Sequence, residues 1–257
     1  MKTHKRRLKS RLSPLTVVML IVLVLYCAFL LGMLLWAVLT ALKEPLAFNR
    51  NKVGLPNPWY FENIPYVLKN AEIRKEQGVV PFGEIVWNSI LYSVGCALVN
   101  TFVTAVVAYA CSKYKCAFSK FIYGLVLVVM VIPVVGNQTS EIQMSMNLGL
   151  YDKMIGMLVM RASFLGIYFL VFYDMFCAVP AALSEAAEID GAGEVTKFFK
   201  IAIPLISPTL FYLFCTGFIG NLQAYVDSQV FANGHPGAQT IVYFVWNYGI
   251  SRSRYGI

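Results

Sequence analysis

Charged side chains are scarce in this chain of 257 residues. Asp, Glu, Lys and Arg make up only 13% of it, whereas about 25% is usual for a soluble globular domain. Hydrophobic residues make up 58%, and the mean hydropathy is +0.65. Intrinsic disorder and a long coiled coil are both excluded, because each needs a polar, highly charged composition. A soluble fold would leave much of this apolar surface without a partner, so the composition predicts a polytopic membrane protein.

Residues that carry chemistry are also few. The chain has two histidines, His4 and His235, and its six cysteines form no CxxC or Cys/His spacing. No Ser/His/Asp set or metal-ligand cluster is apparent, and no Walker A sequence is present to cradle a phosphate. We therefore expect no catalytic, cofactor-binding or metal-binding residues, and a protein that is not an enzyme. The cysteines are interpreted as small apolar residues in helix packing.

Long stretches without charge define the membrane spans. Residues 12–42, 85–112, 121–140 and 201–226 lack Asp, Glu, Lys and Arg, and a helix that crosses the hydrocarbon core needs about 20 apolar residues. The stretch 154–184 is a fifth candidate, although it contains Arg161 and Asp174. Because the apolar runs are continuous and do not alternate, helices are favoured over barrel strands. The sequence thus predicts an all-α, polytopic transmembrane helical bundle with spans at 15–41, 86–110, 120–138, 155–178 and 205–226.

Basic residues in short flanks predict the orientation of these spans. Six of the 21 basic residues lie between Lys2 and Arg11, so residues 1–14 are predicted to be a cytoplasmic N-terminus. The net charge of +8 is then mainly a topology signal and not a nucleic-acid patch. The loop 111–120, with three lysines, is also expected on the cytoplasmic side. By alternation, residues 42–85 form an extracytoplasmic loop and residues 179–204 are cytoplasmic. We interpret 228–251 as a loop with a short amphipathic piece.

The segment 180–204 predicts two short helices between spans. Pro180 suits a first helical turn, and Gly191 offers a left-handed C-terminal cap. A second helix is expected from about Glu194, and Pro204 begins the next span. Small and apolar residues recur at helical spacing on the first helix, at Ala182, Ala186 and Ile189. Two interpretations stay open on these grounds: a docking element for another protein, and an ordinary loop with a solvated charged face.

The residues of this segment also carry a family resemblance. Glu185-Ala186-Ala187, followed by Asp190-Gly191-Ala192 and then by Ile201 and Pro204, resembles the EAA loop, the signature of permease subunits of ABC importers. Further residues resemble the carbohydrate-uptake permeases, and the second permease subunit of maltose-type systems is the most similar. The likeness covers roughly residues 15–257 and includes Asn88-Ser89, Ile132-Pro133 and Leu148-Gly149-Leu150.

The resemblance implies a fold, a mechanism and partners. The fold is that of a type I ABC importer permease, with a core domain over 86–257; such permeases usually have six spans, so a sixth is expected beyond Ile257. ATP is bound by a separate cytoplasmic ATPase dimer, and no cofactor belongs to this chain. The other implied partners are a second, different permease subunit, an extracytoplasmic solute-binding protein, a sugar and the lipid bilayer of a prokaryotic cell membrane. The ATPase interface is assigned to Glu185, Ala186, Ala187, Asp190, Gly191, Ala192, Ile201 and Pro204.

Polar residues that follow the third and fifth spans are candidates for the substrate path, because planar amides and aromatic rings suit a carbohydrate. The alternative is that they satisfy one another or face water at the outer interface. Asp174 supports a different function, since a lone intramembrane acid is a functional hypothesis by default and can carry the proton of a secondary transporter or channel. The path candidates are Asn137, Gln138, Glu141, Gln143, Asn221, Gln223, Tyr225 and Asp227.

Overall fold

The computed structural model of the chain describes residues 13–75, 78–132, 136–231 and 238–251. The chain divides into two compact units, Met1–Lys69 with Arg254–Ile257, and Asn70–Ser253. Each unit is described by itself. The predicted basic N-terminus, Pro133 and His235 lie outside the described residues.

The first unit is dominated by one long apolar helix, α1 (Pro14–Ala41). Ser13 caps it by accepting a hydrogen bond from the Thr16 backbone N–H, and Pro14 occupies the first helical position. None of its residues is buried, as suits a helix whose apolar surface is covered by lipid. After α1 come the short helices α2 (Pro45–Arg50) and α3 (Asn63–Asn70). The unit thus matches the predicted first span, 15–41.

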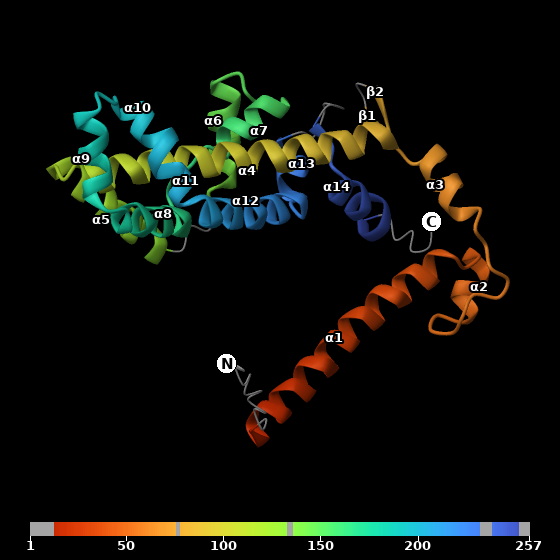
Figure 1. The fold of residues 1–257 in the computed structure, drawn as a ribbon. Helices are drawn as coiled ribbons and strands as arrows, with labels where there is room; N and C mark the ends of the chain where they lie inside the picture. The colour runs from red at the N-terminus through yellow and green to blue at the C-terminus, as the bar shows by residue number, and fades with distance from the viewer. Residues whose placement is uncertain (1–12, 76–77, 133–135, 232–237, 252–257) are drawn as a thin grey trace. The chain divides into compact units, whose positions relative to one another are not determined.

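The second unit is built around α4 (Phe82–Lys113), which packs mainly against α8 (Ile167–Ala178) and α12 (Ser207–Leu222) (Figure 1). Many of its buried side chains are small or carry a hydroxyl, which lets neighbouring helices approach closely. The hydroxyls of Ser89 and Ser93 donate to carbonyls one turn earlier, at 2.8 and 2.7 Å, so they are satisfied within the helix.

Shorter elements surround these three helices. A small antiparallel hairpin pairs Ile73 with Val80, and both side chains are buried beside Ile85 at the start of α4. The hairpin lies in the segment predicted as an irregular extracytoplasmic loop and was not expected. The remaining elements are β1 (Glu72–Lys75), β2 (Gly78–Pro81), α5 (Ala117–Val131), α6 (Gln138–Asn147), α7 (Met154–Met160), α9 (Ala181–Ile189), α10 (Glu194–Lys197), the π-helix η1 (Phe198–Ala202), α11 (Ile203–Leu205), α13 (Val226–Phe231), α14 (Ile241–Val245) and the π-helix η3 (Trp246–Ser251).

Aromatic rings form the largest core of the second unit. Phe169, Phe172 and Phe176 lie fully buried along α8. The Phe176 ring meets Tyr109 of α4 edge-on, with ring centroids 5.3 Å apart. Phe198 at the start of η1 packs against both rings, at centroid distances of 5.0 Å to Tyr109 and 6.2 Å to Phe176. The core therefore joins η1 to the far end of α4, away from the hairpin.

Two of the described helices, α1 and α4, are each long and apolar enough to cross a membrane alone. The predicted spans 15–41 and 86–110 coincide with or lie within them. Two bent pairs pass the same test together: α8 with α9, bent by 66°, and the stretch Glu194–Leu205 with α12, bent by 80°. The shorter α5 is also apolar, and it ends at Val131, before the predicted end of the third span.

The prediction of one continuous span over 155–178 is wrong. Helix α7 ends at Met160 and α8 begins at Ile167, so the helical part of this stretch is broken between them. Arg161 directs its side chain toward Asp227 at the break. Ser163 lies between α7 and α8, and its backbone carbonyl belongs to neither helix. It accepts a hydrogen bond from the side chain of Asn100 in α4, at 2.9 Å. The predicted fifth span, 205–226, corresponds to α12, and the break at Ile206 between α11 and α12 lies at its start.

Candidate functional site

The segment 180–204 folds as two short helices joined by a tight turn, as predicted. Pro180 precedes α9, which begins at Ala181. Gly191 has φ +78°, in the left-handed region that only glycine adopts without strain. The Gly191 N–H donates to the Glu188 carbonyl at 3.0 Å, and the Ala192 N–H donates to the Ala187 carbonyl at 2.8 Å. This is a Schellman cap, and it fixes the direction in which the chain leaves α9.

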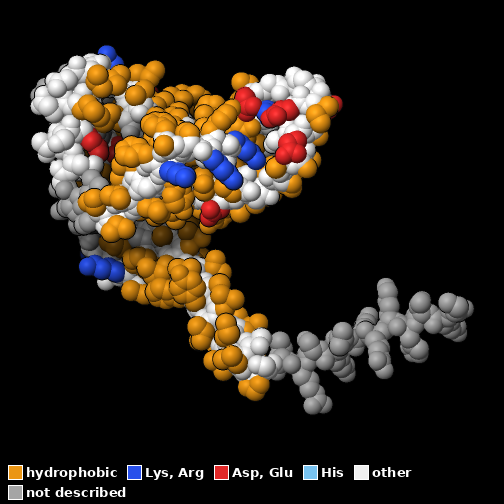
Figure 2. All heavy atoms as spheres, turned by 90° about the vertical axis from the view of Figure 1, so that its left-hand side faces the viewer, with side chains coloured by type: hydrophobic (Ala, Val, Ile, Leu, Met, Phe, Trp, Pro, Cys, Tyr) orange, Lys and Arg blue, Asp and Glu red, His pale blue; other side chains and the backbone are white. Residues whose placement is uncertain are grey.

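The two alanines of the EAA sequence point to different sides of α9. Ala187 is buried within this chain at 9% exposure, whereas Ala186 is exposed. Leu183 and Ile189 are exposed as well, at 42% and 87%. An apolar strip therefore runs along the outer face of α9. Figure 2 views the molecule from the end that carries α9, and it shows acidic side chains gathered beside hydrophobic ones on this face.

Acidic groups flank the apolar strip. Glu185 and Asp190 are exposed, and neither takes part in an ion pair with any residue that the structure describes. Their carboxylates are thus free to meet basic groups of another protein. The strip and these acids together make α9 a surface suited to docking, since an amphipathic helix binds by laying its apolar face in a groove.

A buried lysine that sequence reasoning missed ties α9 to α10. Lys197 is only 5% exposed, and its ammonium pairs with Glu188 of α9 at 2.7 Å and with Glu194 of α10. The hydrogen bonds that Lys197 donates to these two carboxylates raise the pKa of Lys197 above its usual range. The hydrogen bond from Lys197 lowers the pKa of Glu194, although desolvation opposes this. The i, i+3 spacing of Glu194 and Lys197 is a signal for their pairing that the sequence contains. The pairing of Lys197 with Glu188 has no such signal, because Glu188 lies on the other side of the turn.

The residues after Lys197 anchor the segment to α4. Phe198, Ala202 and Ile206 are buried at 6%, 2% and 3% exposure, and Phe199 stacks on Phe102 of α4 with centroids 6.5 Å apart. The predicted anchors Ile201 and Pro204 are half-buried and exposed, respectively. The anchoring side of this stretch is therefore the face that carries Phe198, Ala202 and Ile206, and not the positions that the family motif marks.

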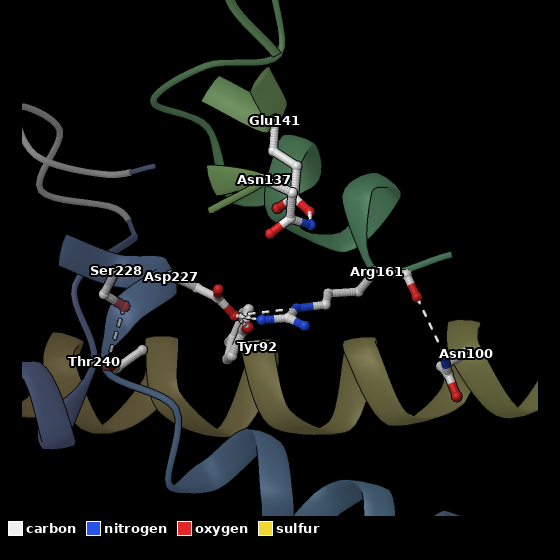
Figure 3. A network of polar contacts seen from close by, with 8 residues as sticks. All are labelled: Tyr92, Asn100, Asn137, Glu141, Arg161, Asp227, Ser228 and Thr240. Atoms are coloured by element: carbon white, nitrogen blue, oxygen red, sulfur yellow. Dashed lines mark hydrogen bonds and ion pairs between the residues drawn. The ribbon is translucent and has the colours of Figure 1, made fainter. Parts of the chain in front are cut away.

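A second polar group lies within the bundle. The Tyr92 hydroxyl of α4 donates to the Asp227 carboxylate of α13, and the Arg161 guanidinium donates to the same carboxylate oxygen through Nη2 and, at 3.1 Å, through Nε (Figure 3). Tyr92 and Asp227 are buried at 1% and 7% exposure. Because a charge that loses its partner inside a protein is costly, this network holds the ends of α7 and α13 against α4.

The other candidates for the substrate path divide into two groups. Asn137 donates to Glu141, and Gln143 donates to Asn147 at 3.3 Å. Glu141 is half-buried, and the other three residues are exposed. These residues satisfy one another, which was the alternative interpretation. Gln138 and Tyr225 instead line one cavity of about 670 Å³. Asn221 and Gln223 lie at the end of α12, outside the residues that line this cavity.

The cavity is lined by amides and tyrosines. Besides Gln138 and Tyr225, its polar lining consists of Tyr151, Gln229 and Tyr243, and none of its described lining residues is charged. Trp246 stacks on Tyr225 with centroids 5.6 Å apart and on Tyr243 at 6.2 Å. The indole therefore holds both tyrosine rings in place behind the cavity. Cavities that bind small molecules usually measure about 300–1,000 Å³.

Asp174 lies on the outward side of α8. It is exposed, whereas its neighbours Phe172 and Phe176 face the core. It forms no ion pair with any described residue. The structure thus places this acid on the surface of the part of the bundle that it describes.

The fold and the exposed EAA helix define a helical membrane permease. The chain belongs to the family described as binding-protein-dependent transport system inner membrane component, whose profile matches residues 101–253. The predicted family, the helical bundle and the location in a membrane are confirmed by this match. Members of the family are non-catalytic membrane subunits of ABC importers, and a separate ATPase hydrolyses ATP.

Individual relatives agree with the family. The chain is 28% identical over 210 residues to the sn-glycerol-3-phosphate transport system permease protein UgpE of Yersinia enterocolitica, covering 81% of this chain and 70% of that protein. It is 24% identical over 199 residues to the diacetylchitobiose uptake system permease protein NgcG of Streptomyces coelicolor, covering 77% and 63%. A bacterial ABC transporter that imports the acidic polysaccharide alginate has the same fold, with a TM-score of 0.78 at 19% identity, over 98% of this chain and 84% of that one.

Proposed function

We propose that this chain is one of two permease subunits of a carbohydrate importer, and that α9 is its docking element for the ATPase. The observation that carries the proposal is the outer face of α9, where Leu183, Ala186 and Ile189 are exposed beside the free carboxylates of Glu185 and Asp190. In this arrangement the apolar strip enters a groove of the ATPase. Glu185 pairs with a basic group at the rim of that groove.

The placement of α9 supports a cytoplasmic docking side. Phe198, which directly follows α10, packs on Tyr109 near the end of α4, with ring centroids 5.0 Å apart. The lysine-rich loop that contains Tyr114 and the α9–α10 segment therefore lie at the same end of α4. Basic loops are retained in the cytoplasm, so this end of the bundle faces the ATPase and the N-terminus is cytoplasmic as well. A second permease and an extracytoplasmic solute-binding protein complete the importer.

The cavity supports a neutral carbohydrate as substrate. Its amides and tyrosines offer hydrogen bonds and ring faces to a polyhydroxylated molecule, and Arg161, which could attract an anion, is already paired with Asp227. Of the relatives, NgcG is named for the neutral sugar diacetylchitobiose, whereas the others are named for the anions sn-glycerol-3-phosphate and alginate. The neutral character of the substrate therefore rests on the cavity, whose described lining residues are uncharged. We place the substrate path at Gln138, Tyr151, Tyr225, Gln229 and Tyr243.

Charge changes on α9 and in the turn that follows it test the docking proposal. We expect Glu185→Lys and Gly191→Asp to reduce co-purification of the ATPase and to abolish ATP-driven uptake in proteoliposomes. Glu62→Lys makes the same charge change at an exposed position in the first unit, and this control should transport normally. If both α9 variants bind the ATPase and transport like the unmodified protein, the docking assignment is wrong.

The same proteoliposomes separate this function from a secondary transporter that acts through Asp174. Uptake should require ATP and an added solute-binding protein, and Asp174→Asn should leave the ATP requirement unchanged. Uptake driven by a pH gradient without ATP would contradict the proposal.

A further inference from the structure

Lys197 is a buried lysine, with a side chain that is 5% exposed. It ends the four-residue helix α10, and the next residue, Phe198, enters the aromatic core. Lysine is almost never fully buried unless it is paired. Here the ammonium is paired twice, to carboxylates that are themselves half-exposed, at 61% for Glu188 and 52% for Glu194. The lysine is thus the enclosed member of a three-residue ion cluster.

The cluster links α9 and α10, which the chain otherwise connects only through a turn. Glu188 belongs to the last turn of α9, and Lys197 and Glu194 belong to α10. Between α9 and α10 lie only the residues Asp190 to Gly193, two of which are glycines. The Schellman cap sets the direction in which the chain leaves α9, and the ion cluster adds a side-chain contact that holds α10 against α9 across the turn.

The contacts of the next two residues continue the same connection. Phe198 packs on Tyr109, and Phe199 stacks on Phe102, both along α4. These phenylalanines begin the π-helix η1, and π-helical turns are rare and often occur at functional sites. Lys197 therefore stands between the docking helix α9 and a row of ring contacts on the central helix of the bundle.

We propose that Lys197 is a positioning residue that makes α9 and α10 one rigid lever, so that movement of α9 by the ATPase is delivered to α4. The inference rests on the proposed docking role of α9. When the cluster is intact, displacement of α9 moves α10, and the Phe198 and Phe199 contacts pass that displacement to α4. When the cluster is broken, α9 moves with the ATPase while α4 stays in place.

The test compares docking, ATP hydrolysis and transport in one reconstituted complex. For Lys197→Met we expect the ATPase to co-purify as before. The ATP hydrolysed per substrate molecule should rise by about threefold or more, which is the factor that corresponds to the loss of a partly solvated ion pair. Lys197→Arg should restore the ratio, because it keeps the charge. Lys200→Met removes an exposed lysine three residues further on and should leave the ratio unchanged.

A second variant keeps the inference testable if Lys197→Met fails to fold. Glu188→Gln changes a half-exposed side chain and leaves Lys197 paired with Glu194, and it should raise the same ratio. The lever is wrong if whichever of Lys197→Met and Glu188→Gln folds hydrolyses the same amount of ATP per substrate molecule as the unmodified protein. This holds even if Glu185→Lys still releases the ATPase. If Glu185→Lys has no effect on docking, the proposed function fails first.

Discussion

The turn at Gly191 gives the sharpest quantitative prediction, because its cost is purely conformational. Gly191 has φ +78°, and a Cβ built on it meets no atom within 4 Å. Gly191→Ala therefore introduces no clash, but it forces an L-residue into the left-handed region at about 1–2 kcal/mol. That free energy lowers the ratio of the native α9–α10 arrangement to its alternatives by a factor of about 5–30. We expect ATP-driven uptake to fall, by at most that factor.

Two matched variants isolate the conformational origin of the effect. Gly191→Asn should lose less activity than Gly191→Ala, since asparagine tolerates the left-handed region. Gly193→Ser adds a side chain to the same turn at φ −72°, also with open space around the added Cβ, and it should behave like the unmodified protein. Uptake should be measured in proteoliposomes beside hydrogen exchange of the α9 amides. Equal uptake by Gly191→Ala and the unmodified protein, or equal loss by Gly193→Ser, would refute the reasoning.

Three further predictions concern the other contacts. Arg161→Met leaves the buried Asp227 carboxylate uncompensated, so it should lower the free energy of unfolding in detergent by up to about 3 kcal/mol. Asp227→Asn removes the buried charge itself and should cost less. Equal thermal shifts for the two variants would contradict this. The pKa of Glu194 is lowered in the folded protein, so its contribution to the ion cluster is present at neutral pH and is lost as the pH falls through that lowered pKa. A spin label on α9 should gain mobility over that acidic range, and a label in Lys197→Met should show no such change. Tyr225→Ala should raise the KM for uptake and leave ATPase co-purification intact; an unchanged KM would remove Tyr225 from the path.

Local signals in the sequence predicted the docking segment well. Pro180 and Gly191 are read from backbone preferences alone, and the structure places α9 between them with the expected left-handed cap. Windows of hydropathy likewise found the long helices, because lipid exposure needs only a run of apolar residues. Both predictions depend on residues that are close together in the chain.

Features that depend on distant partners were not predictable in the same way. The break after Met160 accompanies a pairing of Arg161 with Asp227, which lies 66 residues further along the chain. A hydropathy window counts Arg161 as an interruption and carries no information on its partner. The burial of Ala187 beside the exposed Ala186 was also missed, because the motif marks both alanines without showing which side of α9 faces the bundle.

The substrate path shows the same limit. Asn137, Gln138 and Glu141 look equivalent in the sequence, but Asn137 and Glu141 bond to each other while Gln138 lines the cavity. Gln138 is joined there by Gln229 and Tyr243, which both lie in the stretch 228–251 that we predicted to be a loop with a short amphipathic piece. Only the packing of α6, α13 and α14 brings these residues to one place.

Cysteine cross-linking along α9 tests the central claim most directly. In a variant without the six native cysteines, single cysteines at Ala186, Ala187 and Ile189 can be treated with a short bifunctional maleimide in membranes that contain the ATPase. The account predicts cross-links to the ATPase from Ala186→Cys and Ile189→Cys, which are exposed, and none from Ala187→Cys, which is buried. Failure of both exposed positions to cross-link, or equal cross-linking from Ala187→Cys, would contradict it.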